Sequence, residues 1–357
     1  MERFGFVGLP NAGKSSLFNA LTGGDALAAP YAFATKDPNV GVAKVPDGRL
    51  DALAEMSKSK NVVNATVQVV DIGGLVEGAH NGEGLGNKFL GGIREVEAIV
   101  LVLRAFVDHD VPGPSDPLEH LRVLELELAL ADLETVERQI ERRRKVSKLD
   151  KSLVDEVAAL DIALEALSAG LPLYRAKLDA DQRELLGPWF LLTNKPVLAV
   201  VNVNEEDLAR GDEVAAPVVA ELAGADVVTM CVQLEAEAAQ LEGAERIEML
   251  QALGLGEGAL PRLVRAAYHQ LGLRTFLTTG EKESRAWTFH AGAKAPDCAG
   301  VIHTDFQRGF IRAEVIHWDD LIAIGSWAKA KELGKIRSEG KDYEVQDGDV
   351  VEIRFNG

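Results

Sequence analysis

Residues 3–15 read RFGFVGLPNAGKS, and this stretch decides the fold. Residues 8–15 match the phosphate-binding pattern GxxxxGK[ST], the apolar run before them is typical of a buried strand, and SLFNAL at 16–21 predicts the first turns of a helix. In that setting backbone N–H groups and the helix N-terminus converge on phosphates. Lys14 is expected to reach the β- and γ-phosphates of a nucleoside triphosphate, and Ser15 to hold Mg²⁺. The predicted nucleotide-binding residues of this loop are Asn11, Ala12, Gly13, Lys14, Ser15 and Ser16.

The composition is that of a globular chain with a strong acidic balance. Its 357 residues suffice for two or three domains, and no apolar run approaches the length of a membrane span. No signal-peptide pattern precedes the first strand. Cys231 and Cys298 are too few for a disulfide framework and lack zinc-site spacing, so we expect a reducing, cytoplasmic location. The net charge of −18 argues against nucleic-acid binding by the whole surface, but leaves room for a local basic patch.

Two elements downstream of the loop are typical of nucleotide hydrolases. Residues 63–70 (VNATVQVV) resemble a strand and lead into Asp71-Ile-Gly-Gly74, a DxxG element. Its Asp supports Mg²⁺ and its Gly amide senses the γ-phosphate. Thr35 lies in a stretch punctuated by Pro and Gly, where a threonine could complete the Mg²⁺ shell. We therefore predict Lys14, Thr35 and Gly74 as catalytic residues, and Ser15, Thr35 and Asp71 as metal ligands.

The base is expected to bind after a later buried strand, PVLAVV at 196–201. That strand runs into Asn202-Val-Asn-Glu205, where GTP-binding proteins carry NKxD. The carboxylate of NKxD accepts hydrogen bonds from guanine, and adenine offers no such donors on that edge. Here Val203 replaces the Lys and the longer Glu205 replaces the Asp. A site that does not pair with a substrate edge loses its means of rejecting the analogue. Asn202, Val203 and Glu205 are the predicted base contacts, with ATP favoured and GTP open.

These motifs together resemble the Obg-like ATPase (YchF) family. The resemblance rests on GLPNAGKS (8–15), FATKDPNVG (33–41), DIGGLVEGAHNGEGLGNKFL (71–90), the NxxE element at 202–205, GVIHTDFQRGFIRAEVI (300–316) and EGKDYEVQDGDVVEIRFNG (339–357), and it spans nearly the whole chain. It implies a translation-factor-class P-loop NTPase that prefers or accepts ATP. It also implies a coiled-coil insertion, a C-terminal TGS domain, and links to ribosomes and stress responses.

The residue after DxxG is Leu75, where many small GTPases use a Gln to orient the attacking water. This resembles a superfamily branch with an apolar residue there, some members of which use K⁺ and a loop Asn. Asn11 holds that loop position, so K⁺ stimulation is a hypothesis; equally, Asn11 could only shape the loop. Some relatives position the water with a His in the loop after the strand at 98–103. His109 is the nearest candidate here, but it could equally be a solvated loop residue without that role.

Residues 118–190 are rich in Leu, Glu, Ala and Arg, and predict an antiparallel helical hairpin that turns near 147–151. The predicted apolar positions are Leu121, Leu124 and Leu128 on the first helix, and Leu153, Val157, Leu160, Leu164 and Leu167 on the second. Near the turn lie Arg142-Arg-Arg-Lys145, Lys148 and Lys151. Either these cations are a solvated helix face, or they contact RNA or a ribosome.

From about Thr278 the pattern returns to strands, at 286–290, 310–316 and 350–355, with a tight turn at 346–349. The resemblance identifies this segment as a TGS, ubiquitin-like β-grasp domain. A second basic stretch comprises Lys329, Lys331, Lys335, Arg337 and Lys341. Either it is a solvated surface, or the TGS domain, like the hairpin, contacts RNA or a ribosome through it.

The sequence therefore predicts a three-layer α/β/α P-loop nucleotide domain with a mainly parallel sheet at 1–117 and 191–277, a coiled-coil hairpin at 118–190 and a β-grasp domain at 278–357. Two functions fit. One is an ATPase switch whose nucleotide state controls docking on a ribosome or another RNA-containing partner. The other is a binding module for which nucleotide is a structural ligand with little turnover. A metabolic kinase is a distant third, and we expect a monomer.

Overall fold

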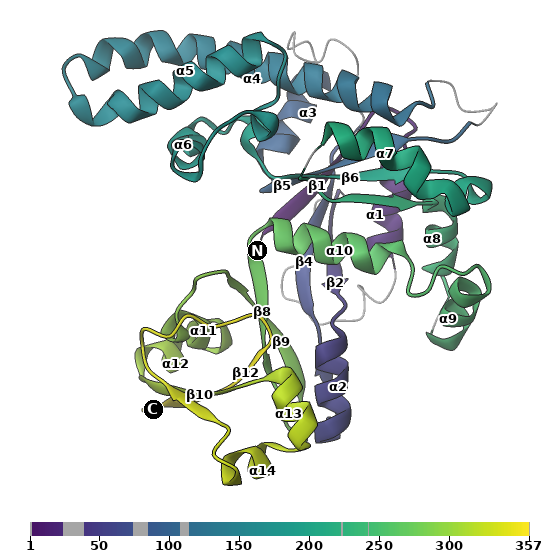
Figure 1. The fold of residues 1–357 in the computed structure, drawn as a ribbon, viewed down its shortest axis with the longest axis vertical. Coiled ribbons are helices and arrows are strands. Elements are labelled where there is room, and N and C mark those ends of the chain that lie inside the picture. The colour runs from purple at the N-terminus through teal and green to yellow at the C-terminus, as the bar shows by residue number, and fades with distance from the viewer. Residues whose placement is uncertain are drawn as a thin grey trace. The chain divides into compact units, whose positions relative to one another are not determined.

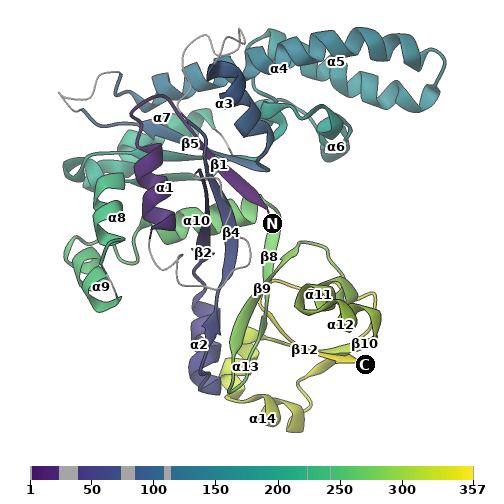
Figure 2. The ribbon, with the colours of Figure 1, turned by 180° about the vertical axis from the view of Figure 1, so that it is seen from behind.

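The computed structural model describes residues 2–23, 39–73, 85–107, 114–222, 224–241 and 243–356, with only the backbone described at 85–88. The chain divides into two compact units. The first contains residues 1–43 and 68–267, and the second contains residues 44–67 and 268–357. Figure 1 shows both units, and Figure 2 shows them from behind.

The first unit is built on a six-stranded sheet in which β1 lies near the middle. The strand order is β2 (Val40–Val45), β4 (Ala65–Asp71), β1 (Arg3–Val7), β5 (Ala98–Arg104), β6 (Val197–Asn202) and β7 (Val227–Met230). The pairs β1–β4, β1–β5, β5–β6 and β6–β7 are all parallel. All seven residues of β5 are buried, as a central strand covered on both faces requires. The carboxyl ends of these strands therefore meet at one edge, where ligands of such sheets bind.

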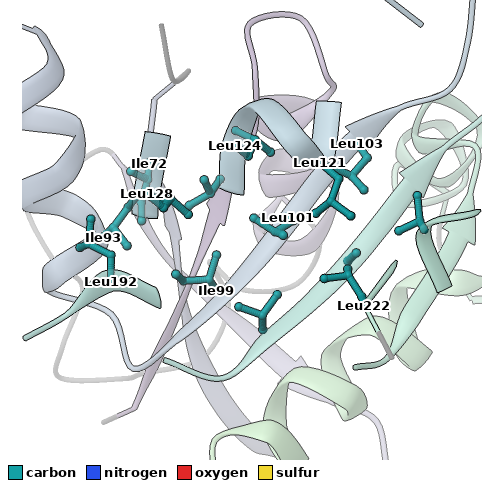
Figure 3. Close-up of a cluster of buried hydrophobic side chains, with 14 of the residues drawn as sticks. Ile72, Ile93, Ile99, Leu101, Leu103, Leu121, Leu124, Leu128, Leu192 and Leu222 are labelled. Carbon is teal, nitrogen blue, oxygen red and sulfur yellow. The ribbon is translucent and has the colours of Figure 1, made fainter. Parts of the chain in front are cut away.

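Helices cover both faces of this sheet. On one face lie α3 (Leu85–Arg94), the first half of α4 (Pro117–Ser147) and α7 (Gly211–Glu221), and on the other lie α1 (Lys14–Thr22), α8 (Val232–Ala238) and α10 (Ala259–Gln270) (Figure 1). Ile99, Leu101 and Leu103 of β5 form the centre of the core on the α4 side (Figure 3). This arrangement confirms the predicted three-layer α/β/α fold.

Helices α4 and α5 (Val154–Ser168) form the predicted hairpin, which turns at 148–150 and continues through a 3-10 turn, η2 (Lys151–Leu153). Val136 and Ile140 of α4 pack with Ala159, Leu160 and Ala163 of α5. Leu121, Leu124 and Leu128, predicted as apolar positions of the first helix, are buried in the core on the sheet and not against α5 (Figure 3). The reason is length, because a helix of 31 residues serves the sheet with its first half and α5 with its second.

Short elements connect the hairpin to the rest of the first unit. They are η3 (Leu173–Arg175), α6 (Ala180–Leu186), η4 (Gly187–Trp189) and η5 (Leu192–Asn194). Further along the chain, η6 (Glu205–Arg210) joins β6 to α7, and α9 (Gly243–Ala252) lies between α8 and α10. Buried Asp132 of α4 accepts hydrogen bonds from the backbone N–H groups of Leu192 and Thr193 at 2.8 and 2.7 Å, and from the Thr193 hydroxyl. The root of the hairpin is thereby fixed to the segment that enters β6.

The second unit is a mixed sheet packed on helices. Its strand order is β11 (Arg337–Glu339), β10 (Phe310–His317), β12 (Asp349–Phe355), β8 (Leu273–Thr278), β9 (Ser284–His290) and β3 (Val62–Val63). Its helices are α2 (Gly48–Ser57), α11 (Ala295–Ile302), α12 (Thr304–Arg308), α13 (Trp318–Ile324) and α14 (Trp327–Glu332). Cys298 and Ala299 of α11 are buried against Phe276, Phe289 and Val351 of the sheet. A sheet packed on one principal helix is the predicted β-grasp arrangement, and β9, β10 and β12 cover the predicted strands.

Residues 44–67 belong to the second unit, although the sequence boundaries assigned them to the nucleotide domain. In the structure β3 pairs in parallel with β9, and Arg49 at the start of α2 donates to Asp347 at 2.9 Å. The Ser59 hydroxyl donates to the Gly280 carbonyl at 2.8 Å. A helix followed by a two-residue strand has the same local pattern in either unit, so only these long-range contacts identify its place.

Candidate nucleotide-binding site

The phosphate loop joins β1 to α1 and depends on two glycines. Gly13 is the N-cap of α1 with a left-handed φ of 101°, and a Cβ added there would lie 2.6 Å from Nδ2 of Asn202. A Cβ at Gly8 would lie 2.5 Å from the carbonyl oxygen of Val102. These two contacts explain in this chain why the pattern fixes glycine at both positions. The loop therefore presents main-chain N–H groups at a helix N-terminus, where anions bind.

Lys14 lies beneath the loop with 6% of its surface exposed. Its Nζ donates to the carbonyl oxygen of Leu9 at 2.9 Å. Burial lowers the pKa of Lys14, and the charge of Asp71 acts in the opposite direction. The ammonium group is thus held under the phosphate loop with little hydration to lose, which favours its pairing with phosphate oxygens.

Ser15 and Asp71 form an oxygen cluster that suits Mg²⁺. The Ser15 hydroxyl donates to Oδ2 of Asp71 at 2.7 Å, and Oδ1 of Asp71 is buried without a hydrogen-bond partner among the described residues. No group of three or more His, Cys, Asp or Glu side chains that could hold a metal occurs in the described part of the chain. That agrees with Mg²⁺, which is usually held by one or two protein oxygens together with phosphates and water. The predicted Thr35 and Gly74, together with Leu75 and His109, lie outside the described residues.

A pocket of about 840 Å³ lies against the loop. Its lining residues are Asn11, Gly13, Lys14, Ser15, Ser16, Phe106, Val107, Asn202, Val203, Asn204, Cys231, Val232, Gln233, Ala236, Glu237 and Gln240. The loop residues form a phosphate end. The remaining residues, from the segments after β5, β6 and β7, form a base end. The structure thus brings together all the predicted loop residues except Ala12, which is fully buried.

Asn202 connects the two ends of the pocket. Its Nδ2 donates to the carbonyl of Ala12 at 3.0 Å, and its Oδ1 accepts from the N–H of Val232 at 3.1 Å. Val203 lines the pocket as predicted, but Glu205 does not. The chain enters η6 at Glu205, and its side chain is exposed. Asn202 therefore has a positioning role, and the structure does not support Glu205 as a base contact.

Two family models match the chain. A model described as "50S ribosome-binding GTPase" matches residues 3–153. A model named for the C-terminal part of YchF GTPases, and described as a protein of unknown function, matches residues 273–356.

Curated relatives match over almost the full length. The ribosome-binding ATPase YchF of Bacillus subtilis (strain 168) is 49% identical, over 99% of this chain and 98% of the relative. That of Escherichia coli O157:H7 is 46% identical over the same shares. A solved structure, the YchF GTPase of Schizosaccharomyces pombe, has a TM-score of 0.88 at 34% identity, covering 99% of this chain and 97% of that one. The chain belongs to the YchF family. This confirms the resemblance inferred from its motifs.

Sequence reasoning assigned no base contact to eight residues that line the base end of this YchF-family chain: Phe106, Val107, Cys231, Val232, Gln233, Ala236, Glu237 and Gln240. Their common feature is position, because the first five follow directly on the carboxyl ends of β5 and β7. The rule that ligands bind beyond the carboxyl ends of parallel strands could have indicated those five. Cys231 is a buried free cysteine whose pKa is raised by burial, so its thiol stays protonated at neutral pH.

The wall formed by Phe106 is held by a buried arginine. Arg104 is 2% exposed; its Nε donates to the carbonyl of Phe106 at 3.0 Å and its guanidinium lies 4.5 Å from the centre of the Phe106 ring. In this YchF-family chain Arg104 therefore fixes both the backbone and the ring of Phe106.

Within the described ranges no helix is both long and apolar enough to cross a membrane.

Proposed function

We propose that this chain binds and hydrolyses ATP as a molecular switch that associates with ribosomes. The observation that carries the proposal is the pocket itself: a complete phosphate loop, connected through Asn202 to a base end in which the position of the guanine-reading carboxylate, Glu205, lies outside the lining. The relatives are named ribosome-binding ATPases, which supports both the nucleotide and the partner. Such a partner supports a cytoplasmic location, and we propose that the chain is a monomer.

The chain's own residues supply binding and positioning. The N–H groups at the start of α1 hold the phosphates, and Lys14 pairs with the β- and γ-phosphates. Ser15 and Asp71 hold Mg²⁺, with Thr35 as a further ligand and Gly74 as the contact for the γ-phosphate. When bound, Mg²⁺ neutralises charge on the phosphate oxygens. Because Lys14, Ser15 and Asp71 are already held by hydrogen bonds, positioning and charge stabilisation carry the reaction.

Asn11 has two proposed roles that the structure allows. Its side chain is exposed in the pocket lining, where it could ligate K⁺ beside the phosphates. Its φ of 62° lies in the left-handed region, which asparagine tolerates better than most residues. Stimulation of hydrolysis by K⁺ that disappears in Asn11→Gly would favour the first role. Equal rates in KCl and NaCl would leave Asn11 as a loop-shaping residue.

GTP is the second candidate substrate because one carboxylate does line the base end. Glu237 on α8 accepts from Nε2 of Gln233 at 3.1 Å, and an exposed carboxylate at that end could pair with guanine. ATP is favoured because Glu237 is already paired with Gln233, and because Glu205, at the usual position of the guanine reader, is not among the lining residues.

Equilibrium binding of ATP and GTP with Mg²⁺ tests the proposal, followed by steady-state hydrolysis of each in matched KCl and NaCl buffers. Tighter ATP binding with slow turnover supports an ATPase. Preference for GTP that is lost in Glu237→Gln would make the chain a GTPase. Tight binding of either nucleotide without turnover, alone or with ribosomes present, would favour the binding-module alternative.

The switch itself is tested with ribosomes. Co-sedimentation with purified ribosomes should differ between ATP- and ADP-loaded protein, and Lys14→Met should abolish that difference. Ribosome binding at full strength that never responds to nucleotide would contradict a switch while leaving a binding module.

A further inference from the structure

The turn of the α4–α5 hairpin concentrates positive charge in an acidic chain. Residues 138–156 contain seven basic and four acidic residues, whereas the chain as a whole has a net charge of −18. Figure 1 shows that this turn is the end of the hairpin farthest from the sheet of the first unit. A local reversal of charge at a projecting tip favours contact with a polyanion.

The structure divides this basic run into two groups with different roles. Arg143 lies 4.9 Å from the centre of the Trp189 ring and pairs with Glu156 at 3.1 Å. Arg144 pairs with Asp161 at 2.5 Å, and also with Glu141. These two arginines hold the hairpin closed and are not free for a partner.

The second group faces solvent. Arg142, Lys145 and Lys148 are exposed and have no ion pair among the described residues. Arg142 and Lys145 are three residues apart, so they are neighbours on one face of α4, and Lys148 follows one turn later. Three of the four carboxylates in the segment are engaged: Glu141 with Arg144, Glu156 with Arg143, and Asp150 with Ser152. These three carboxylates therefore do not neutralise Arg142, Lys145 and Lys148.

Apolar side chains complete this tip. Leu149 is 92% exposed, and Val146 and Val154 are 40% and 52% exposed, so the three form an apolar end that the protein does not cover. The packing between the helices ends at Ile140 and Ala159, and these residues lie beyond it. An exposed leucine at the end of a well-formed hairpin has no role in the stability of the fold that would explain its position.

We propose that the tip formed by Arg142, Lys145, Lys148 and Leu149 docks on the sugar–phosphate backbone of ribosomal RNA. A row of cations spaced along one helix face matches the closely spaced charges of a nucleic-acid strand better than scattered carboxylates of an acidic protein. The shallow minor groove of duplex RNA presents riboses, on which Leu149 can lie while the cations reach phosphates on either side. This inference rests on the proposed ribosome association and assigns it to a particular surface.

The experiment measures binding of the full-length, ATP-loaded chain to purified ribosomes over a range of KCl concentrations. The test variant is Arg142→Ser/Lys145→Ser/Lys148→Ser. Its matched control, Lys60→Ser/Lys177→Ser/Lys282→Ser, removes the same charge from exposed lysines elsewhere that have no ion pair among the described residues. We expect the test variant to bind at least about tenfold more weakly, and the slope of log K against log [KCl] to fall by about 3, near 1 per phosphate contact. The control should keep the wild-type slope.

Leu149→Ser is tested in the same assay against Leu126→Ser, a leucine of α4 that is 50% exposed and lies outside the tip. Leu149→Ser should weaken binding several-fold without changing the salt slope, and Leu126→Ser should not weaken it. ATP affinity and thermal unfolding should be unchanged in every variant, because none of these residues lines the pocket or is buried.

Each outcome separates this inference from the function on which it rests. Wild-type protein that does not bind ribosomes would contradict the proposed function. Wild-type binding that the triple variant retains, with an unchanged slope, would overturn the inference alone. Binding of wild type but not of the triple variant to protein-free ribosomal RNA supports the RNA backbone as the partner. If the triple variant loses binding to ribosomes, but binds protein-free ribosomal RNA as well as wild type does, the proposed contact with RNA is wrong and the tip binds a protein surface of the ribosome.

Discussion

At the phosphate end of the pocket the groups proposed to meet the ligand are main-chain N–H groups and one lysine from a single segment, residues 8–16. At the base end they are side chains from three segments that are about 100 and 30 residues apart along the chain, after β5, β6 and β7. Under the proposed function the first end binds the triphosphate, which ATP and GTP share, whereas the second must distinguish adenine from guanine. We infer that the affinity for nucleotide and the preference for one base depend on different segments of the chain.

Asn202 connects the two ends by hydrogen bonds, to the carbonyl of Ala12 and from the N–H of Val232. Substitutions at the phosphate end should therefore weaken ATP and GTP equally, and those at the base end should change their ratio. Substitution of Asn202 tests whether the ends are independent.

The largest effect is expected for Lys14→Met at the phosphate end. The variant keeps the length of the side chain but removes the buried ammonium, whose pairing with phosphate is a buried charge interaction of about 3 kcal/mol, or about 100-fold in affinity. Calorimetric titration with ATP and with GTP in the presence of Mg²⁺ measures the loss.

Both nucleotides should lose affinity by the same factor, and hydrolysis should fall below detection. The matched control is Lys195→Met, another partly buried lysine that donates to main-chain carbonyls but lies outside the pocket. A Lys14→Met variant that binds nearly as well as wild type would show that the lysine is not part of the phosphate end.

The sequence predicted the phosphate end because its information is local. Gly8, Gly13 and Lys14 are fixed by backbone geometry within eight residues, and the structure gives each a reason. Asp71 and Asn202 could also be predicted, because each follows a recognisable strand. The sheet, the hairpin and the C-terminal strands were predicted from periodicity in the same way.

What could not be predicted depends on tertiary contacts. Residues 44–67 join the second unit only through partners such as Ser284 and Asp347. Leu121, Leu124 and Leu128 have the spacing of a helical seam, and only the structure shows that they face a sheet. Phe106 lines the pocket but belongs to none of the motifs recognised in the sequence. The roles of Thr35 and Gly74 stay predictions.

Asn202→Ala should have the next largest effect. It leaves the buried carbonyl of Ala12 and the buried N–H of Val232 without partners, each costing about 1–2 kcal/mol. Because the loop and the base wall both relax, we expect ATP and GTP affinities to fall together by about tenfold or more. Competition binding with a fluorescent nucleotide measures both.

Asn204→Ala is the control, since it lines the same pocket but makes neither of these hydrogen bonds. If Asn202→Ala instead changes the ratio of ATP affinity to GTP affinity without weakening the binding of both nucleotides, Asn202 reads the base and does not connect the ends.

The pH dependence of binding should be a smaller effect, and confined to the phosphate end. Burial lowers the pKa of Lys14 from its ordinary value of 10.5. The protonated form binds phosphate, so affinity is complete below the pKa of the free protein and is lost as pH rises through it. We expect ATP affinity to decline by several-fold at an alkaline pH where an ordinary lysine would still be charged.

Lys14→Arg provides the comparison, because a guanidinium stays protonated over the whole range. Its affinity will be lower throughout, but the alkaline decline should be absent. Titrations from pH 7 to 10, with circular dichroism to verify folding, test this. A decline of the same size in both proteins would assign it to another group.

The smallest effect is expected for Glu205→Ala, and it sharpens the comparison most. The side chain is exposed at the start of η6 and outside the pocket lining, so its removal should change ATP and GTP affinity by less than about twofold. Glu237→Gln, whose carboxylate does line the base end, is the matched variant. Competition binding with both nucleotides measures the two variants side by side. A large loss of GTP affinity in Glu205→Ala would mean that this carboxylate moves into the pocket when guanine is present. The base end would then be completed by the ligand, whereas the phosphate end is already built before the ligand arrives.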